Sequence, residues 1–381
     1  MSNPAPTSLP ETITRVAMEK VGVITLHTEP TRPLEEGEYF IKTLYSGISA
    51  GTELTFYMGT NPKASAGIDP IRRLFRGDLE PALEDIFPKY EGYMESGEVT
   101  ASRNPHFPVG THVAGLYHHQ SGYIAGADDA IVPLPKGFDP LLGIWVAKMG
   151  PISMNGVLYA ADEVNRKPVS TLKGSLDGQR VAVFGAGMIG LLCGVFAKWA
   201  GAADVVIVDS IAERLAIAEK LGLTPHKANP NMAIELKDRW HRDEARDTGA
   251  DIAFQCTGSD YLLSEAFRCL REQGTVVDLG FYQQGANNVF LGREFHHNCL
   301  RHVCAQIGVM PRAQQAQWNR RRLSEETISF LQEHGASLKE HLVTHVVPFN
   351  RAQEMFDHLE HRDPTMLQVV LQPDESVGND R

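Results

Sequence analysis

The chain has 381 residues, of which 43% are apolar and 22% charged, an ordinary composition for a globular protein of two or three domains. No stretch approaches the roughly 18 to 20 consecutive apolar residues of a membrane helix, and the polar, proline-rich start lacks the pattern of a secretory signal. The formal charge of -11 argues against a diffuse nucleic-acid-binding surface and favours a small-molecule partner. We therefore expect a cytoplasmic protein without a membrane or nucleic-acid partner.

The cysteines are odd in number and all lie in the second half of the chain, namely Cys193, Cys256, Cys269, Cys299 and Cys304. This distribution is unlike an extracellular disulfide framework. The last two lie near His296, His297 and His302, but in an extended segment Cys299 points away from His302 and Cys304. We therefore expect no metal site there.

The first 140 residues contain short apolar or alternating runs separated by Gly and Pro, which is typical of an antiparallel, barrel-like β domain. The expected strands are 13–18, 39–45, 97–101, 112–116 and 130–134, and a strand over 113–124 is expected to carry His118 and His119. The segment 61–89 holds four prolines and a mixed-charge run. It is expected to form a long loop with one or two helical turns over a cleft.

From Gln179 onward, strands alternate with amphipathic helices, a pattern that predicts an α/β fold with a doubly wound parallel sheet. Strands are expected at 180–184, 205–208, 251–256, 275–279 and 300–307, and helices at 188–200, 212–221 and 261–270. After Pro311 the pattern predicts helices at 324–334 and 351–361 and β-like runs at 342–348 and 366–371.

A glycine motif, Gly185-Ala-Gly-Met-Ile-Gly190, directly follows an apolar strand and opens a helix, which is the context of a dinucleotide-binding turn. Gly185 permits the turn, Gly187 lets the backbone approach a pyrophosphate, and Gly190 lets the helix pack on the strand. Asp209, at the end of the next strand, is placed to bind the ribose hydroxyls and to repel a 2′-phosphate. NAD is therefore favoured over NADP, with Arg214 as the residue that could instead meet a 2′-phosphate.

These features resemble the medium-chain dehydrogenase/reductase superfamily, which includes zinc alcohol dehydrogenases, quinone reductases and polyol dehydrogenases. The resemblance covers nearly the whole chain and rests on the glycine motif and on residues 46–53, 92–99, 132–135, 251–258 and 274–280. It implies a GroES-like β-barrel catalytic domain, residues 1–152 and 312–381, interrupted by a Rossmann domain, residues 153–311. It also implies an active site in the cleft between them and a homodimer or homotetramer.

The usual catalytic zinc site of this superfamily has a Cys, a His, and a Cys or Glu, whereas the matching residues here are Ser49, Tyr93 and Met149. Zinc requires thiolate, imidazole or carboxylate ligands, which these three do not supply at neutral pH. The four closely spaced cysteines of the structural zinc lobe are also missing. We therefore expect a zinc-independent member, most similar to the group that includes bacteriochlorophyllide dehydrogenase.

Without a Lewis acid, side chains must take up the hydroxyl proton on oxidation and stabilise the carbonyl oxygen on reduction. The resemblance places the following candidates around the cleft: Tyr93, His119, Lys148, Glu53 and Ser49, with Glu95 as a further carboxylate. Tyr93 can donate to a substrate oxygen, and the ordinary pKa of His119, or of its neighbour His118, suits proton transfer near pH 7. Alternatively, Tyr93 fills the vacated metal pocket, the histidines are structural, and Glu53 forms an ion pair or cap.

The cofactor site is expected to extend to neighbouring strand ends, where ligands bind in parallel sheets. Ile189 is expected to pack behind the nicotinamide, and 257–258 and 280–281 resemble the cofactor-contacting loops of the superfamily; ordinary turn chemistry is the alternative. The expected cofactor-binding residues are Gly185, Gly187, Met188, Ile189, Gly190, Asp209, Ser210, Arg214, Cys256, Thr257, Gly258, Gly280 and Phe281.

The main hypothesis is a zinc-independent, NAD-linked oxidoreductase that transfers a hydride between nicotinamide and a secondary alcohol or ketone in a polyol, sugar or natural product. One alternative is a reductase of activated C=C bonds, of the enoyl or quinone type, which usually prefers NADPH. Another uses tightly bound NAD as a catalytic redox group for elimination or epimerisation. The last is a non-catalytic NAD sensor, against which the retained polar residues argue.

Overall fold

The structure is a computed structural model that describes residues 9–61, 67–79, 87–242, 246–283 and 285–374. The chain forms two compact units, residues 1–148 with 343–381 and residues 149–342. In the described part of the chain, no helix combines the length and apolar character needed to span a membrane.

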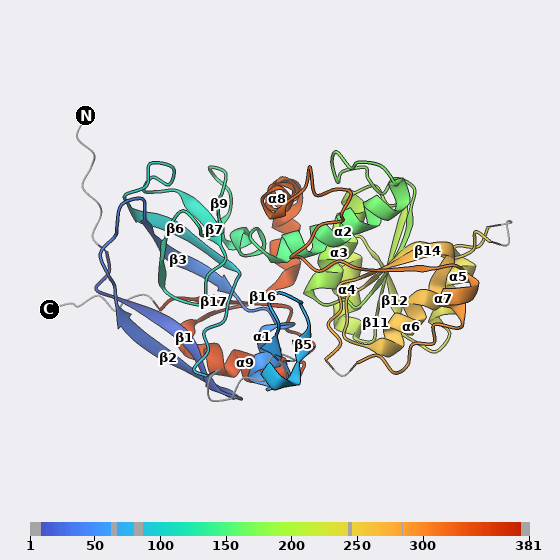
Figure 1. Ribbon diagram of the computed structural model, residues 1–381, viewed down its shortest axis with the longest axis horizontal. Coiled ribbons are helices and arrows are strands. Elements are labelled where there is room, and N and C mark those ends of the chain that lie inside the picture. The colour runs from blue at the N-terminus through green and yellow to red at the C-terminus, as the bar shows by residue number, and fades with distance from the viewer. Residues whose placement is uncertain (1–8, 62–66, 80–86, 243–245, 284, 375–381) are drawn as a thin grey trace. The chain divides into compact units, whose positions relative to one another are not determined.

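The first unit is built on a seven-stranded sheet with the order β16-β17-β3-β6-β7-β9, in which β8 also pairs with β3 (Figure 1). A separate antiparallel ribbon is formed by β1 (Thr12–Lys20) and β2 (Val23–Pro30). The sheet strands are β3 (Tyr39–Gly47), β6 (Glu95–Ser102), β7 (His112–Gly115), β8 (Gly122–Ala125), β9 (Ile131–Pro133), β16 (Val343–Pro348) and β17 (Gln368–Gln372). Because β17 pairs with β3, segments from both ends of the chain complete one sheet.

The predicted strand 113–124 is interrupted in the structure. β7 ends at Gly115 and β8 begins at Gly122, so His119 lies in an irregular segment between them. The backbone there is held from outside: Val16 N donates to His119 O at 2.9 Å, and His119 N donates to Glu91 O at 2.9 Å. These hydrogen bonds take the place of regular strand pairing at His119, whereas the sequence pattern predicted a continuous strand there.

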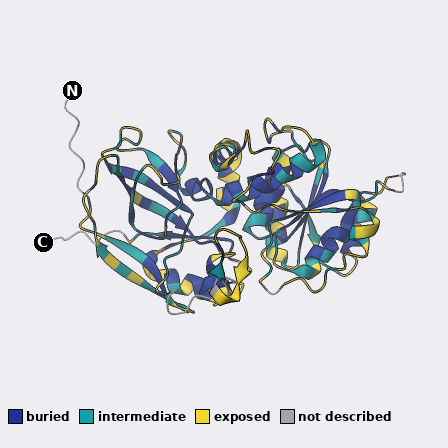
Figure 2. Cartoon of the chain, in the orientation of Figure 1, coloured by how far each residue is buried: buried dark blue, intermediate teal, exposed yellow. Residues whose placement is uncertain are grey.

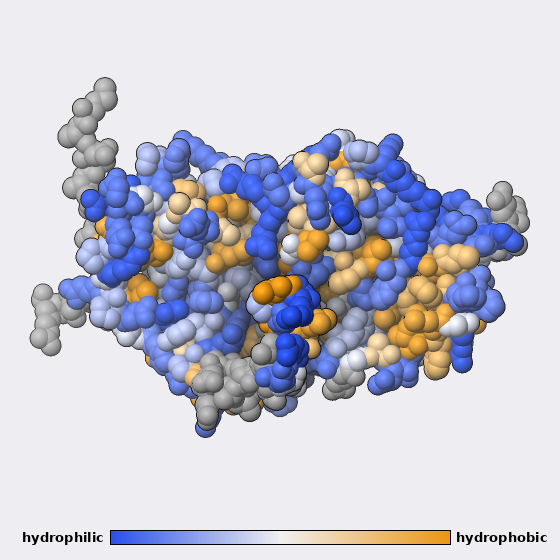
Figure 3. Space-filling view, viewed as in Figure 1, coloured by the Kyte–Doolittle hydropathy of each residue, from blue (hydrophilic) through white to orange (hydrophobic). Residues whose placement is uncertain are grey.

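Short helices and a hairpin complete the first unit. They are α1 (Glu53–Tyr57), η4 (Pro140–Trp145), η5 (Phe349–Arg351) and α9 (Ala352–Glu360), with β4 (Gly67–Ile68), β5 (Phe75–Arg76) and η2 (Gly77–Leu79) inside the predicted loop 61–89. The β4–β5 hairpin replaces part of the expected irregular loop and exposes the apolar side chains of Ile71, Leu74 and Phe75 (Figure 3). Residues 62–66 and 80–86 of this loop lie outside the described residues.

The second unit contains a six-stranded parallel sheet with the order β12-β11-β10-β13-β14-β15. This is the doubly wound order of dinucleotide-binding folds, so the predicted α/β fold class is confirmed. Its strands are β10 (Arg180–Phe184), β11 (Asp204–Asp209), β12 (Thr224–Lys227), β13 (Ala250–Gln255), β14 (Leu270–Asp278) and β15 (Arg301–Cys304). The central strands are buried along their length (Figure 2), which explains their continuous apolar runs.

Helices cover the sheet of the second unit: α2 (Met149–Asn165), α3 (Met188–Trp199), α4 (Ala212–Lys220), α5 (Met232–Arg239), α6 (Asp260–Cys269), α7 (Glu294–His297) and α8 (Arg320–Leu342). The predicted domain boundaries were 152/153 and 311/312, whereas the compact units divide at 148/149 and 342/343. The second difference arises because α8 packs on α2, α3 and α4 and therefore belongs to this unit.

A buried ion-pair cluster supports the N-terminal edge of the parallel sheet. Arg180 is only 5% exposed and donates to Asp251 through its backbone amide (2.7 Å) and side chain (2.9 Å), and also pairs with Asp247 at 2.6 Å. Burial alone would raise the pKa of Asp251, but hydrogen bonds from Arg180 and Arg271 hold it below its ordinary value.

We expect Asp251→Asn to lower the free energy of unfolding at pH 7 by about 1–3 kcal/mol, because an amide cannot accept all of these charged hydrogen bonds. The carboxylate stabilises the fold above its unfolded-state pKa of about 3.9, and this contribution is lost as the pH falls through the lower folded-state value. Urea unfolding at pH 7 and at about pH 3.5 measures both. A wild-type-to-variant difference that grows on acidification would contradict this assignment.

Candidate active site

Polar side chains from four segments converge inside the first unit, although the sequence separates them widely. Ser46, the second-last residue of β3, lies opposite Glu95 on β6 in the sheet register. The chain then turns through Ser49 into α1, which begins at Glu53. The irregular segment after β7 brings in His119. The exposed fractions are 0% for Ser46, Glu53 and Glu95, 1% for His119 and 3% for Ser49, so water has almost no access to this cluster.

His119 is the centre of the cluster. Its Nε2 lies 2.9 Å from Glu53 Oε2, and its Nδ1 lies 2.6 Å from Ser46 Oγ and 3.5 Å from Glu95 Oε1. Ser46 Oγ in turn donates to Glu95 Oε1 at 2.9 Å. Gly92, with φ +118, lies directly against this group, since a Cβ there would meet His119 N at 2.6 Å. Only glycine therefore fits before Tyr93.

Tyr93, Ser49 and Lys148 lie together beside the cluster. The Tyr93 hydroxyl donates to Ser49 Oγ, and the Ser49 amide donates to Glu53 Oε1 at 2.9 Å. The Lys148 ammonium lies 5.7 Å from the centroid of the Tyr93 ring. The structure thus brings together all five predicted catalytic residues, Ser49, Glu53, Tyr93, His119 and Lys148.

The electrostatics separate the roles of these groups. Burial and the Glu53 carboxylate raise the pKa of Tyr93 to about 12, so the phenol keeps its proton at neutral pH. Burial would lower the pKa of His119, but the Glu53 and Glu95 carboxylates raise it to about 10. The expected titration of His119 near pH 7 therefore does not fit its surroundings. Burial raises the pKa of Glu95 to about 7 despite its contacts with His119 and Ser46.

His118 occupies a different environment from His119. The residue His118 as a whole is exposed. Partial desolvation of its ring and the neighbouring cations lower its pKa, although the Glu91 carboxylate acts in the opposite direction. The side chains of the two adjacent histidines therefore have different surroundings, one exposed and one buried, although the segment that holds them is not a strand.

The residues at the zinc positions of the superfamily do not fit a zinc ion. Ser49 accepts a hydrogen bond from the Tyr93 phenol, and neither a hydroxyl nor a phenol is among the thiolate, imidazole and carboxylate ligands that zinc prefers. Met149 begins α2 in the second unit, where it is buried at 4% exposure. Among the described residues, no group of three or more His, Cys, Asp or Glu side chains has a geometry that could hold a metal.

The glycine motif of the second unit has the geometry of a nucleotide-binding turn. Gly185 has φ +101, and a Cβ on Gly190 would lie 1.7 Å from Gly185 O, so helix and turn are in direct backbone contact. A Cβ on Gly187 would meet nothing within 4 Å, and Gly187, Met188 and Ile189 are partly exposed. The first turn of α3 thus leaves an open backbone surface, which fits a pyrophosphate.

The acidic residue of the motif lies beside this turn. Asp209 ends β11 and accepts hydrogen bonds from Ala186 N at 2.6 Å and Ile211 N at 2.9 Å. Each carboxylate oxygen retains capacity for a further hydrogen bond, as ribose hydroxyls would require. Ser210 is exposed next to Asp209, and Arg214 lies in the first turn of α4.

The ends of β13 and β14 complete the candidate cofactor surface. A Cβ on Gly258 would meet Phe281 O at 2.7 Å, and one on Gly280 would meet Thr257 O at 2.2 Å, so the two loops are in close contact. The Phe281 side chain is 51% exposed. Cys256 lies against Gly190, and burial together with the Cys193 thiol raises its pKa, so it is an inert thiol.

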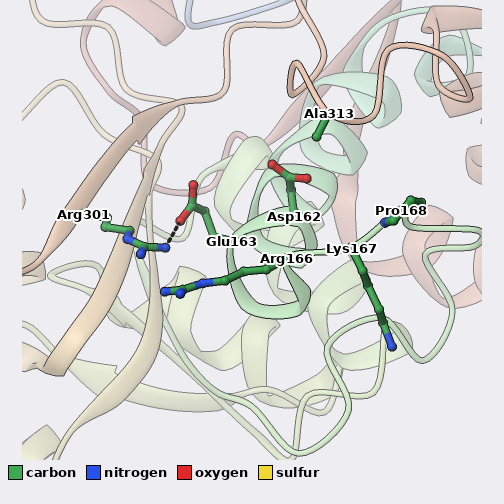
Figure 4. A pocket seen from close by; sticks show the side chains of 7 residues that line it. All are labelled: Asp162, Glu163, Arg166, Lys167, Pro168, Arg301 and Ala313. Atoms are coloured by element: carbon green, nitrogen blue, oxygen red, sulfur yellow. Dashed lines mark hydrogen bonds and ion pairs between the residues drawn. The ribbon is translucent and has the colours of Figure 1, made fainter.

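Two surface pockets also lie in the second unit. The first, of about 440 Å³, is lined by Asp162, Glu163, Arg166, Lys167, Pro168, Arg301 and Ala313 (Figure 4). There Arg301 pairs with Glu163 at 2.7 Å while Arg166 extends beside them (Figure 4). The second, of about 340 Å³, lies at the ends of β14 and β15 and contains Asp278, whose carboxylate bonds His302 and Tyr282. The sequence pattern did not indicate the first pocket, whereas the second includes Gly280 of the predicted cofactor-contacting loop 280–281.

Ser46 is the residue of the buried cluster that the sequence reasoning missed. Its position opposite Glu95 depends on the pairing of β3 with β6, and its contact with His119 depends on an irregular segment. A serine directly after the predicted strand 39–45 carries no local signal of such a role.

The known proteins to which this chain is similar include several dehydrogenases. Residues 189–312 match the zinc-binding dehydrogenase family. Sorbitol dehydrogenase 1 of Saccharomyces cerevisiae is 24% identical over 293 residues, which cover 71% of this chain and 77% of that protein. D-guloside 3-dehydrogenase of Escherichia coli is 32% identical over 203 residues, 52% of this chain and 53% of that protein.

Among solved structures, 2R,3R-butanediol dehydrogenase from Bacillus subtilis has a TM-score of 0.71 at 20% identity, covering 95% of this chain and 100% of that one. This likeness of fold confirms the predicted combination of a GroES-like and a Rossmann domain. The chain is thus an oxidoreductase with the fold of the medium-chain alcohol dehydrogenases, and its residues 189–312 match the zinc-binding dehydrogenase family.

Proposed function

We propose that the protein transfers a hydride between NAD and a secondary alcohol or ketone of a polyol or sugar, without zinc. The observation that carries this proposal is the group of Tyr93, Ser49 and Lys148, in which Ser49 and Tyr93 stand at positions that the resemblance matches to metal ligands. The relatives named as sorbitol and guloside dehydrogenases favour a polyhydroxylated substrate. The zinc-independent branch and the likeness to the bacteriochlorophyllide dehydrogenase group are part of the same proposal.

In this mechanism NAD, when bound at the glycine motif, accepts or supplies the hydride. Tyr93 donates its proton to the carbonyl oxygen during reduction, and its phenolate accepts the hydroxyl proton during oxidation. Ser49 holds the phenol in place, and the positive charge of Lys148 favours the phenolate. Because the pKa of Tyr93 is raised to about 12, neutral pH favours reduction and alkaline pH favours oxidation.

Calorimetry with NADH and NADPH, followed by turnover with cofactor deuterated at the transferred position, tests the proposal. We expect NADH to bind more tightly and deuterium to appear on a carbinol carbon of the product, with activity unchanged by a zinc chelator. Deuterium at a former C=C bond would instead identify an enoyl or quinone-type reductase. Tightly co-purifying NAD without net NADH formation would indicate an internal redox cycle, and no nucleotide binding would refute the proposal.

Asp209→Ala is expected to weaken NADH binding about tenfold and to narrow the preference over NADPH. The carboxylate supplies hydrogen bonds to ribose hydroxyls and repels a 2′-phosphate, and both effects vanish with it. Dissociation constants for both nucleotides measure the change. Arg214→Ala is the companion variant: if it weakened NADPH binding more than NADH binding while Asp209→Ala left the preference unchanged, the discriminating role would belong to Arg214.

The segment 61–89 is proposed to take part in substrate selection, since its described hairpin displays both apolar and basic side chains on the surface (Figure 3). Assembly into a homodimer or homotetramer and a cytoplasmic location are also part of the proposal. Light scattering of the purified protein tests the assembly, and cell fractionation tests the location.

A further inference from the structure

We propose that His119 is a positioning residue that remains a doubly protonated imidazolium and, through Glu53, fixes the Ser49 backbone and the Tyr93 phenol. This inference rests on the proposed function for its catalytic meaning, because Tyr93 is there the proton-transferring group. It replaces the role of proton carrier that the sequence suggested for His119.

When Glu95 is ionised and accepts the Ser46 hydrogen, the hydrogen-bond pattern has both ring nitrogens of His119 donating. Ser46 has one hydroxyl hydrogen, which goes to Glu95 Oε1 at 2.9 Å, so Nδ1 of His119 must donate to Ser46 Oγ at 2.6 Å. Nε2 lies 2.9 Å from Glu53 Oε2, a carboxylate oxygen that only accepts. A ring that donates from both nitrogens carries a positive charge.

Burial makes this charge a fixed element of the site. His119 and Glu53 are 1% and 0% exposed, so neither side chain can exchange its partner for water. Removing one charge of a buried pair leaves the other uncompensated, which is costly. The imidazolium therefore holds the Glu53 side chain in one position.

Glu53 passes this constraint to the residues proposed to carry the chemistry. Its second oxygen, Oε1, accepts the Ser49 amide at 2.9 Å, and Ser49 Oγ accepts the Tyr93 hydroxyl. A chain of direct hydrogen bonds thus runs from the ring of His119 to the phenol. Both ring nitrogens of His119 are hydrogen-bonded within the cluster, and the residue lies directly against Gly92. His119 therefore does not contact a substrate.

The charge of Glu53 also acts on Tyr93 directly. The titratable groups facing the phenol are Glu53 from α1, Glu91 before β6, and Lys148; the two carboxylates raise its pKa. Glu53 contacts His119, which in turn lies against Glu95. Neutralising Glu53 is therefore expected to favour the phenolate, while Ser49 and Lys148 stay in place.

The first test follows the His119 ring by NMR in the wild-type protein, assigned by comparison with a variant lacking it. We expect its signals to stay in the protonated position between about pH 6 and 8.5, whereas the ring of exposed His118 remains neutral in the upper part of that range. A His119 ring that loses its proton near pH 7 would overturn the proposal.

The second test is a double-mutant cycle of Glu53→Gln and His119→Gln, with His118→Gln as the matched control. Each single variant is expected to lower the Tm by roughly 5–10 °C because one buried charge loses its partner. The double variant is expected to regain about half or more of the summed loss of the two single variants. The control is expected to change the Tm by about 1 °C or less. Additive losses would contradict a charged pair.

The third test separates positioning from simple support of the fold. The phenolate absorbance of Tyr93, taken as the difference from Tyr93→Phe, is titrated in the wild-type and Glu53→Gln proteins. We expect the phenolate-to-phenol ratio at a fixed alkaline pH to rise about 3- to 10-fold in Glu53→Gln. An unchanged ratio would show that Glu53 does not act on Tyr93. None of these tests uses nucleotide or substrate, so their failure is distinguishable from failure of the proposed function.

Discussion

Replacing Tyr93 with phenylalanine is expected to lower kcat by about 10²- to 10⁴-fold while nucleotide affinity changes little. The change removes one hydroxyl, which donates to Ser49 Oγ and is the group proposed to exchange a proton with the substrate oxygen. The ring is retained, so its packing beside Lys148 is preserved. Steady-state rates in both directions, with calorimetric binding of NADH, measure the effect.

Two companion variants sharpen this experiment. Ser49→Ala keeps the phenol but removes its acceptor, and we expect a smaller loss of about tenfold. His118→Gln changes an exposed side chain of the adjacent segment and should leave kcat within about twofold. If Tyr93→Phe turned over at the wild-type rate, another group would transfer the proton, and the assignment of this cluster as the catalytic site would fail.

Alanine substitutions at Gly187 and Gly190 are expected to differ in what they damage. A Cβ on Gly187 meets no protein atom within 4 Å, so Gly187→Ala should leave the Tm nearly unchanged. It would nevertheless occupy the surface that a pyrophosphate approaches, and we expect the dissociation constant for NADH to rise about 100-fold or more. Thermal unfolding and calorimetry together measure this separation.

Gly190→Ala is expected to lower both affinity and Tm. Its Cβ would lie 1.7 Å from Gly185 O, so the start of α3 must move away from the turn. Gly292→Ala is the matched control in the same unit, because nothing lies within 4 Å of its added Cβ. Wild-type affinity in Gly187→Ala would show that the nucleotide does not use this turn, whatever the effect of Gly190→Ala.

Prediction of the second unit from sequence succeeded where local patterns are strong. Strand 180–184, the glycine turn and helix 188–200 were placed nearly as observed, because a buried parallel strand and a glycine-bearing turn leave local signatures. Helix α2 was missed because its residues are buried on most sides, which removes the amphipathic period. The predicted boundary at 311/312 differs from the boundary at 342/343 in the structure because α8 packs on helices of the second unit.

The candidate catalytic cluster shows where sequence patterns end. The sequence identified Ser49 and Tyr93 from their positions in matching segments, and it singled out Lys148, Glu53 and His119 as titratable neighbours. It suggested that His119 would titrate near neutral pH, which follows from its ordinary pKa alone. Burial between Glu53 and Glu95 reverses that expectation, and burial is a property of the assembled unit.

By itself, the amino-acid sequence determined the α/β class and the glycine-rich turn, and it led to the expectation that Ser49, Tyr93 and Met149 stand in place of metal ligands. These follow from residue types and short-range spacing. Only the tertiary structure decided that Ser46, Glu53, Glu95 and His119 form one buried network behind Tyr93. The reason is physical: hydrogen bonds and desolvation depend on contacts between β3, α1, β6 and the segment after β7, and the sequence separates these elements by tens of residues.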